Sequence, residues 1–252
     1  MSKWKWLALA ATLYLIFFIM MLPAQFGLWL VDVPKGLQVT GVSGSFWNGR
    51  ANRVSWNGRT VDDVFWTVNP GSMFAGTLEL DVVAGQSSMS NIKLDGTVGA
   101  SSSGWFVNNL EFEMPANVAS EFAPVQLQLR LGGYVVGKIA TASQGEPWCE
   151  QLDGKLTWVK PTVASTSVSN PLKLDDTRAN LSCNAGNVVA DVSDDGRVLG
   201  LDVKGTLAEG QFIVDGSLKP GREFPQSLEQ MLRFVATPKG DGSYLINLDG
   251  PL

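Results

Sequence analysis

Leu78-Glu79-Leu80-Asp81-Val82 alternates apolar and charged side chains over five consecutive positions. The same alternation recurs in Leu127–Leu131 (LQLRL) and in Leu199–Val203 (LGLDV). Successive side chains of a β-strand point to opposite faces, so this period predicts strands with one face on a core and the other in water. Parallel strands buried on both faces would instead read as continuous apolar runs. The pattern therefore predicts a mainly β protein with an antiparallel sheet.

Turn and helix signals fit between these strands. The dipeptides Asn57-Gly58, Asp195-Gly196 and Asp241-Gly242 tolerate positive φ and predict tight hairpins. Helical periodicity is scarce. Its best instance is Pro225–Ala236, where apolar residues at helical spacing predict a short amphipathic helix near the C-terminus. Shorter helical turns are expected within residues 70–75 and 115–123.

A weak internal repeat also runs along the chain. An apolar residue, Asp-Gly, one further residue and a second apolar residue occur four times, and a Lys-Gly version occurs at Val203–Leu207. Asp-Gly is ordinary turn punctuation, but the alternation continues through several copies. Glycine within a strand marks a bend, so the repeat favours glycine-kinked strands in a strongly curved sheet. The four Asp-Gly copies are Leu94–Val98, Leu152–Leu156, Val214–Leu218 and Leu248–Leu252.

The N-terminus carries an apolar run, Trp6–Leu22, that contains no charged residue. Its length is near the lower limit for a transmembrane helix. Lys3 and Lys5 precede it. By the positive-inside rule, the N-terminus is therefore expected in the cytoplasm and the chain after the apolar run on the other side of the membrane. This predicts four parts: a cytoplasmic tail (residues 1–5), a transmembrane anchor (6–22), a membrane-proximal linker (23–40) and a periplasmic β domain (41–252).

A cleaved signal peptide is the alternative reading of the same segment. The best cleavage triplet is Leu22-Pro23-Ala24, whose first position holds a bulky leucine where a small residue is preferred. The apolar run is also long for a signal-peptide core. The retained anchor is therefore preferred, and it leaves the main domain outside the cytoplasm.

The amino-acid composition excludes several classes of catalytic and binding site. The chain of 252 residues contains no histidine and has a formal net charge of −5. The missing imidazole excludes Ser-His-Asp catalysis and histidine-ligated zinc, and the acidic balance argues against nucleic acid as a partner. The acid pairs Asp62-Asp63, Asp175-Asp176 and Asp194-Asp195 do not match a calcium loop, and solvated turn carboxylates explain them better. The sequence therefore predicts a non-enzyme without catalytic, metal or cofactor-binding residues.

The two cysteines, Cys149 and Cys183, are the only pair in the chain. In an oxidising compartment an even count predicts a disulfide. Two unrelated buried thiols are the alternative. Neither cysteine has a basic neighbour in the sequence that would lower its pKa, so a redox-active role is not expected.

Nine tryptophans are many for this length. Core packing explains a large part of them, because each indole buries a large apolar area. Alternatively, some line a groove or a partner interface, where tryptophan is enriched. The candidates for such a surface are Trp56, Trp66, Trp105 and Trp158.

Two blocks carry a family resemblance. Gly41–Gly49 (GVSGSFWNG) opens the exported domain, and Gly145–Cys149 (GEPWC) continues to Leu152–Leu156, with the second cysteine downstream. The chain thereby resembles the type II secretion system protein N family, itself similar to AsmA-like proteins with long curved sheets. The residues that carry the resemblance are Gly41, Gly44, Phe46, Trp47, Gly49, Gly145, Pro147 and Trp148.

The resemblance implies an inner-membrane, single-pass accessory component of the machine that exports folded proteins across the outer membrane. Its expected partners are inner-membrane secretion-system proteins, together with the bilayer around residues 6–22. The alternative is a periplasmic lipid-binding or lipid-transfer module whose curved sheet holds acyl chains along an apolar groove.

Overall fold

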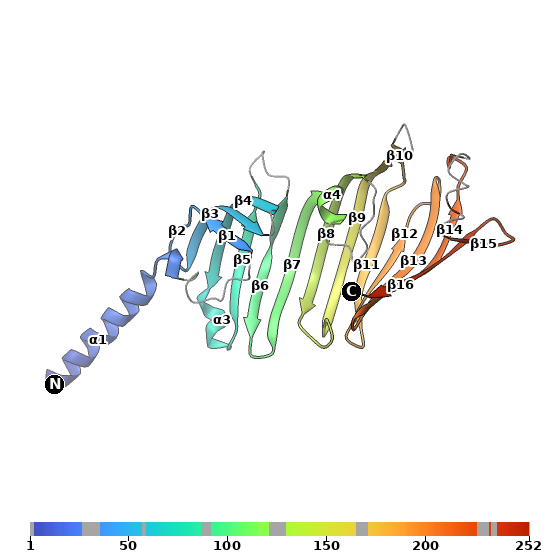
Figure 1. Ribbon diagram of the computed structural model, residues 1–252. Helices are drawn as coiled ribbons and strands as arrows, with labels where there is room; N and C mark the ends of the chain where they lie inside the picture. Colours follow the sequence, from blue (N-terminus) through green and yellow to red (C-terminus); the bar gives the residue numbers. More distant parts are fainter. Residues whose placement is uncertain are drawn as a thin grey trace. The chain divides into compact units, whose positions relative to one another are not determined.

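The computed structural model describes residues 3–26, 36–56, 59–86, 92–120, 130–164, 171–225, 232 and 236–251. Within them the chain is mostly β, with one long apolar helix at the N-terminus (Figure 1). It divides into two compact units, Met1–Ser102 and Ser103–Leu252. The predicted fold class, a mainly β chain with an apolar N-terminal helix followed by an antiparallel sheet, is confirmed.

Helix α1 (Lys3–Met20) is the predicted apolar segment. It is long and apolar enough to cross a membrane, with a mean hydropathy of 1.4, and none of it is buried. The helix begins before the predicted Trp6 and ends two residues before Leu22. Its end has a physical cause, because Pro23 disfavours the helical conformation of the residue that precedes it.

The first unit contains a small antiparallel sheet with the strand order β1-β3-β4-β5-β6, and β2 pairs with β3. The short helix α3 connects β4 to β5. The elements after α1 are β1 (Leu37–Thr40), β2 (Ser43–Gly44), β3 (Asn48–Trp56), β4 (Arg59–Asn69), α3 (Pro70–Phe74), β5 (Leu78–Ala84) and β6 (Lys93–Ser101).

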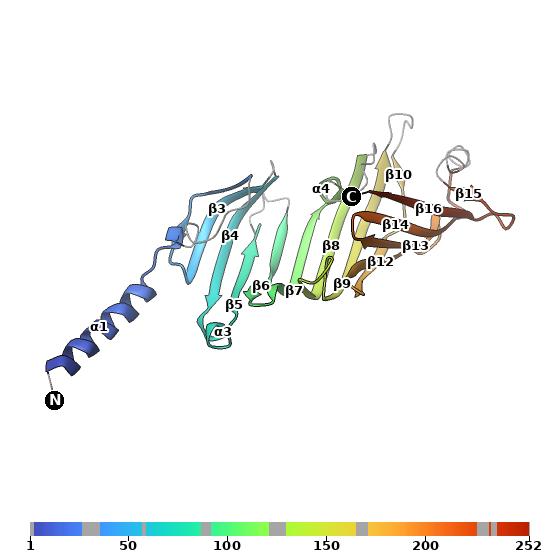
Figure 2. The same cartoon turned by 60° about the horizontal axis from the view of Figure 1, so that its bottom comes forward.

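The second unit follows the order β7-β8-β9-β11-β12-β13-β14-β16-β15, with β10 beside β9. Its two end strands are not paired in that order, so the sheet is not closed, and its strands turn progressively from β7 to β16 (Figure 2). The elements are β7 (Gly104–Pro115), α4 (Ala116–Ala119), β8 (Arg130–Ser143), β9 (Gln151–Ala164), β10 (Leu172–Lys173), β11 (Thr177–Asn184), β12 (Asn187–Ser193), β13 (Leu199–Ala208), β14 (Gln211–Pro220), β15 (Thr237–Pro238) and β16 (Tyr244–Pro251).

The predicted strands and turns can be compared with these elements. Leu78–Val82 lies in β5 and Leu199–Val203 in β13, as expected, whereas only the last two residues of Leu127–Leu131 are described, at the start of β8. Gly196 and Gly242 have φ values of 74° and 80° and occupy the predicted turns. Asn57 and Gly58 lie outside the described residues, but the strands on either side of them pair.

The two predicted short helical turns are found as α3 and α4. Of the predicted amphipathic helix at Pro225–Ala236, most lies outside the described residues. Leu232, which is helical, and the buried Ala236 pack against Leu218 and Tyr244 at one end of the second unit's sheet.

The second unit's sheet has two chemically different faces. Cross-strand pairing aligns one polar residue from each of eight strands in a row that we call the polar row: Glu111, Lys138, Lys155, Asn180, Asp191, Lys204, Asp215 and Asn247. Within it, Lys138 Nζ lies 2.6 Å from Glu111 Oε1 and Lys204 Nζ lies 3.2 Å from Asp191 Oδ1. The adjacent positions of every strand face the other way and form two apolar rows.

The first apolar row contains Leu110, Ile139, Gly154, Leu181, Ala190, Gly205, Val214 and Leu248. The second contains Phe112, Gly137, Leu156, Ala179, Val192, Val203, Gly216 and Ile246. We call these two rows together the apolar face. The three Asp-Gly pairs of the second unit follow this division, because each aspartate belongs to the polar side and each glycine to the apolar side. The fourth pair lies in β6 of the first unit.

Glycine has a packing role at these positions. A Cβ atom added at Gly154 would lie 2.6 Å from Ile139 Cδ1, and one added at Gly137 would overlap the ring of Phe112. The β13–β14 and β14–β16 registers continue without interruption through Gly216. The repeat therefore provides room for neighbouring large side chains on the apolar face, and strand alternation continues through it as predicted.

Candidate functional site

The first motif block, Gly41–Gly49, forms a tight loop around β2. The Ser45 amide donates to the Asn48 carbonyl at 2.8 Å, and the Asn48 amide donates to Ser45 Oγ at 3.0 Å. Gly44 has a φ of 91°, and a Cβ there would lie 2.6 Å from the Asn48 carbonyl oxygen. Only glycine fits both the conformation and the space, which accounts for this glycine in the motif.

This loop holds the C-terminal end of α1. Trp47 Nε1 donates to the Ile19 carbonyl at 2.9 Å, and the Phe46 amide donates to the Leu22 carbonyl at 2.8 Å. The last carbonyls of a helix lack the usual partner within the helix. Among the described residues, the Ile19 carbonyl otherwise accepts only a long bond of 3.4 Å from the Leu22 amide, so the Trp47 donor strengthens its hydrogen bonding. The Phe46 and Trp47 rings meet edge to face with centroids 5.3 Å apart. Two aromatic motif residues thus join the apolar helix to the sheet.

The same loop is joined to β4. The Val68 amide donates to the Trp47 carbonyl at 2.7 Å, and Trp66 Nε1 donates to the Phe46 carbonyl at 3.1 Å. The Trp66 ring lies so close to Gly49 that a Cβ atom there would overlap it. Motif residues and one predicted groove aromatic, Trp66, therefore form a single structural junction. Beside it lies an open depression of about 350 Å³, which Phe65 and Trp66 help to line.

The second motif block, Gly145–Cys149, is a turn with a cis peptide bond between Glu146 and Pro147. The amides of Trp148 and Cys149 both donate to the Gly186 carbonyl, at 3.1 and 3.2 Å. Trp148 Nε1 donates to the Ala208 carbonyl at 2.9 Å, although the side chain is 42% exposed. The turn therefore connects the β11–β12 hairpin to the β13–β14 hairpin.

The predicted disulfide between Cys149 and Cys183 is present, with Cα atoms 6.1 Å apart. It joins the second motif block to β11. Beside it lies an open depression of about 770 Å³ lined by Gln144, Trp148 and Glu209, among others. The motif residues Gly145 and Pro147 belong to the same rim.

The other tryptophans predicted to line a groove or an interface have different surroundings. Trp158 Nε1 donates to the Gly132 carbonyl at 2.9 Å within the second unit. Trp105 is 48% exposed, and its backbone amide donates to Gln144 Oε1. The Trp56 side chain lies outside the described residues. Trp66 belongs to the first unit and Trp105 and Trp158 to the second, so each is described with its own sheet.

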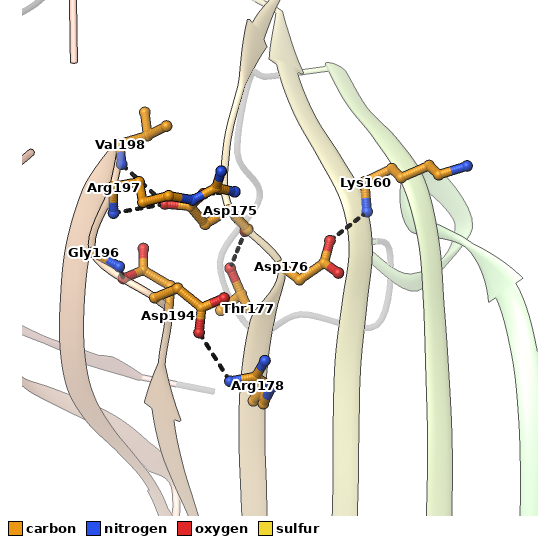
Figure 3. A network of polar contacts seen from close by, with 10 residues as sticks. Lys160, Asp175, Asp176, Thr177, Arg178, Asp194, Gly196, Arg197 and Val198 are labelled. Carbon is orange, nitrogen blue, oxygen red and sulfur yellow. Dashed lines mark hydrogen bonds and ion pairs between the residues drawn. The ribbon is translucent and has the colours of Figure 1, made fainter. Parts of the chain in front are cut away.

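A polar cluster before β11 and β13 contains Asp175-Asp176, an acid pair whose sequence predicts solvated turn carboxylates. That interpretation is wrong for Asp175, which is 1% exposed. Figure 3 shows its contacts with Arg197 and Val198. Its Oδ2 accepts from the amides of Arg197 and Val198 at 2.8 and 2.9 Å, and its Oδ1 lies 2.6 Å from Arg197 Nη2. The Val198 amide, and after it Arg197, hold the Asp175 pKa below its ordinary value against the opposing effect of burial.

The two nearby carboxylates, Asp194 and Asp176, have environments that differ from that of Asp175. Burial raises the pKa of Asp194, which accepts from the amides of Gly196 and Leu201. The exposed Asp176 accepts from the Lys160 amide at 2.8 Å. Each of these carboxylates closes a turn or strand end, and the described residues contain no group of three or more potential metal ligands. The cluster has a structural role in joining β9, β11 and β13.

The family model for type II secretion system (T2SS) protein N matches residues 35–247, a range that contains both motif blocks and both cysteines. The chain belongs to the type II secretion system protein N family. The predicted resemblance is therefore confirmed.

Three relatives are similar to this chain over most of its length. Type II secretion system protein N of Vibrio cholerae serotype O1 is 29% identical over 238 residues, covering 92% of this chain and 91% of the relative. The protein of the same name from Aeromonas hydrophila is 28% identical over 247 residues, covering 96% of each. That of Pectobacterium carotovorum is 24% identical, covering 88% of this chain and 87% of the relative. No solved structure matches the chain.

Membership in the T2SS protein N family supports a component of a type II secretion system and a place in protein secretion. The exposed apolar helix suggests that this component is anchored in a membrane. The motif residues that carried the resemblance occur at two junctions, one between α1 and the first sheet and one among strands of the second.

Proposed function

We propose that this protein is a single-pass inner-membrane accessory component of the type II secretion system. It supports the export of folded proteins across the outer membrane through contacts with other inner-membrane secretion-system proteins. The observation that carries this proposal is the family match over residues 35–247, adjoining a helix with no buried residue. In this topology residues 1–5 are cytoplasmic, 6–22 span the bilayer, 23–40 link, and 41–252 form the periplasmic domain.

The dimensions and charges of the N-terminus support this topology. Eighteen helical residues extend over about 27 Å, which is close to the hydrocarbon thickness of a bilayer. Lys3 and Lys5 precede the apolar segment, whereas the next basic residue is Lys35. This asymmetry favours a cytoplasmic N-terminus.

The described surfaces support an interaction role. The polar row presents paired charges, and the described acidic clusters contribute to turns and strand ends. We propose a protein that acts by binding. The second motif block, with its exposed Trp148 and the open depression beside it, is a candidate contact region in the second unit.

Co-purification tests this proposal in cells. The full chain, tagged at its C-terminus and expressed from its own locus, should bring down inner-membrane secretion-system proteins after mild crosslinking. A deletion strain should lose export of secreted proteins, and the full chain should restore it. An unrelated single-pass inner-membrane protein with the same tag is the control. Normal export in the deletion strain, together with no enriched secretion component, would contradict the proposal.

The apolar face favours a second candidate function, lipid binding. A sheet ordinarily covers an apolar face with a second layer. In the described part of the second unit the strands lie side by side in one layer, and Leu248 of the apolar face is 47% exposed (Figure 1). The rows continue over eight strands, and such a face matches an acyl chain chemically.

Native mass spectrometry of the full chain, released gently from membranes, distinguishes the two candidates. Lipid binding predicts adducts of phospholipid mass that Leu181→Asp abolishes. Asn180→Asp, the matched control one residue away on the opposite face, should retain them. A chain without adducts in any preparation would exclude the lipid module and leave the interaction role.

A further inference from the structure

The most exposed large apolar side chain in the described residues is Phe74, at 96%. It is more exposed than any described apolar side chain of α1 or than Met21, which follows α1 and is 76% exposed. The next large one in the described residues beyond Met21 is Tyr134 at 52%. Phe74 ends α3, and its neighbour Met73 is 49% exposed. Exposing large apolar side chains to water is unfavourable, and a patch of them on a surface is typical of a contact site. We call residues 70–76 the α3 tip.

The backbone of the α3 tip is held in place by hydrogen bonds. Asn69 Oδ1 accepts from the Gly71 amide at 3.0 Å, and Ser72 Oγ donates to the Asn69 carbonyl at 2.8 Å. The Ser72 carbonyl accepts from the amides of Ala75 and Thr77 and from the Thr77 hydroxyl. The tip therefore presents Met73 and Phe74 from a fixed backbone that has already satisfied much of its own hydrogen bonding.

The α3 tip also contains no charged residue. Residues 70–78 read PGSMFAGTL, and the first acid after them is Glu79 in β5. Charged side chains near a bilayer core are costly, and backbone groups that lack hydrogen-bond partners are costly too. The tip has the composition and the internal bonding that entry into the headgroup region requires.

Hydrogen bonds place the tip close to the end of α1. Trp47 bonds to Ile19 near the helix end, and the Trp47 carbonyl accepts from Val68, two residues before α3 begins. Figures 1 and 2 both show α3 at the end of the first unit's strands that lies nearer α1. If α1 spans the bilayer, its C-terminal end lies at the membrane surface, and the α3 tip lies beside that surface.

We propose that the α3 tip is a second membrane contact, in which Phe74 and Met73 enter the headgroup–acyl boundary of the leaflet at the C-terminal end of α1. The proposal rests on the membrane anchoring proposed above. Together with α1, the tip would fix the orientation of the first unit on the bilayer, because two contact points restrict rotation and tilt more than one does. Its partner is therefore the lipid bilayer itself.

Site-specific fluorescence tests this contact. The native cysteines form a disulfide, so an introduced cysteine provides the one free thiol for a polarity-sensitive label. Phe74→Cys tests the tip, and Thr60→Cys, exposed at the opposite end of β4, is the matched control about 30 Å away along the strand. Full chains are reconstituted into vesicles of phosphatidylethanolamine and phosphatidylglycerol that contain a lipid spin-labelled near the headgroup.

The expected result is blue-shifted emission at position 74, with quenching at least about twofold greater than at position 60. Phe74→Ser should not change the thermal midpoint, because the side chain has almost no protein contact to lose. Equal, water-like emission at both positions in floating vesicles would overturn the tip contact while leaving the anchor intact. Shielding of position 74 in native membranes but not in vesicles would assign the tip to a protein partner and would also overturn it.

Failure of the anchor is distinguishable from failure of the tip. If the reconstituted chain does not float with the vesicles and is removed by carbonate washing, the proposed topology is wrong. The tip proposal then fails with it. Flotation is therefore measured first, on the same samples that give the fluorescence.

Discussion

The two motif loops use the same chemistry for different purposes. In each, an indole N–H donates at 2.9 Å to a backbone carbonyl far away in the sequence: Trp47 to Ile19 and Trp148 to Ala208. The first bond joins the sheet of the first unit to a helix without a buried residue. The second lies among strands that a disulfide and a buried carboxylate also hold.

We expect the first loop to position α1 and the second loop to stabilise the fold. Loss of the first bond leaves every strand pair of its sheet in place, so it should alter the placement of α1 rather than the stability of the fold. The second loop shares its neighbourhood with the Cys149–Cys183 link, and changes there should lower the free energy of unfolding. Measurements on the two loops should therefore diverge.

The largest expected effect is the removal of the disulfide. The Cys149→Ala, Cys183→Ala double variant should lose about 3–4 kcal/mol of unfolding free energy, because a closed loop of 34 residues restricts the unfolded chain. Urea denaturation of the detergent-solubilised full chain measures the loss, with Phe74→Ser as a control. A double variant within about 1 kcal/mol of the native protein would show that the second loop is not a stability element.

Asp175→Ala should destabilise the second unit by about 3 kcal/mol, because it leaves the buried Val198 amide, the part-buried Arg197 amide and the Arg197 guanidinium without their acceptor. Asp176→Ala is the matched control, since that carboxylate is exposed and accepts a single described hydrogen bond; its loss should be about 1 kcal/mol or less. Thermal melts of both variants give the comparison. Equal losses of stability in the two variants would show that the burial of Asp175 does not determine its contribution to stability.

The same carboxylate predicts a pH dependence confined to the second unit. The folded-state pKa of Asp175 is lowered, so its stabilising contribution is present above the unfolded-state value of about 3.9 and is lost as pH falls through the folded-state pKa. Urea midpoints measured from pH 7 downward should therefore fall less steeply at the acid end in Asp175→Asn than in the native chain. Parallel curves for the two would contradict the assignment.

The smallest expected effect is the loss of one indole donor. Trp148→Phe should lower the unfolding free energy by about 1 kcal/mol, whereas Trp47→Phe should leave it nearly unchanged. Trp47→Phe should instead broaden the distance distribution between spin labels at Ala11 and Thr60, on α1 and β4. Equal stability losses in the two variants, with no broadening, would remove the distinction between the loops.

Much of the architecture follows from sequence because alternation is a local property. Leu78–Val82 and Leu199–Val203 show their strands directly, and Pro70 marks α3 without any knowledge of its surroundings. The cysteine pair was predictable from compartment and count. The Asp-Gly repeat was recognisable too, although its packing role on the apolar face requires the neighbouring strands.

The functions of Asp175 and Phe74 depend on contacts distant in sequence. Asp175-Asp176 looks like any exposed turn, and only the approach of Arg197 and Val198 makes one of the pair buried. Phe74 reads as an ordinary core residue in the sequence, and its 96% exposure appears only in the structure. Likewise, nothing in the sequence pairs Trp47 with Ile19. Local patterns do not contain this information.

The central claim is that α1 is retained as the membrane anchor of a domain outside the cytoplasm. Intact-mass spectrometry of the native protein from carbonate-washed membranes tests it most directly. The account predicts a mass that includes residues 1–24 and a main domain that added protease digests in spheroplasts but not in intact cells. A soluble periplasmic protein beginning at Gln25 would contradict it.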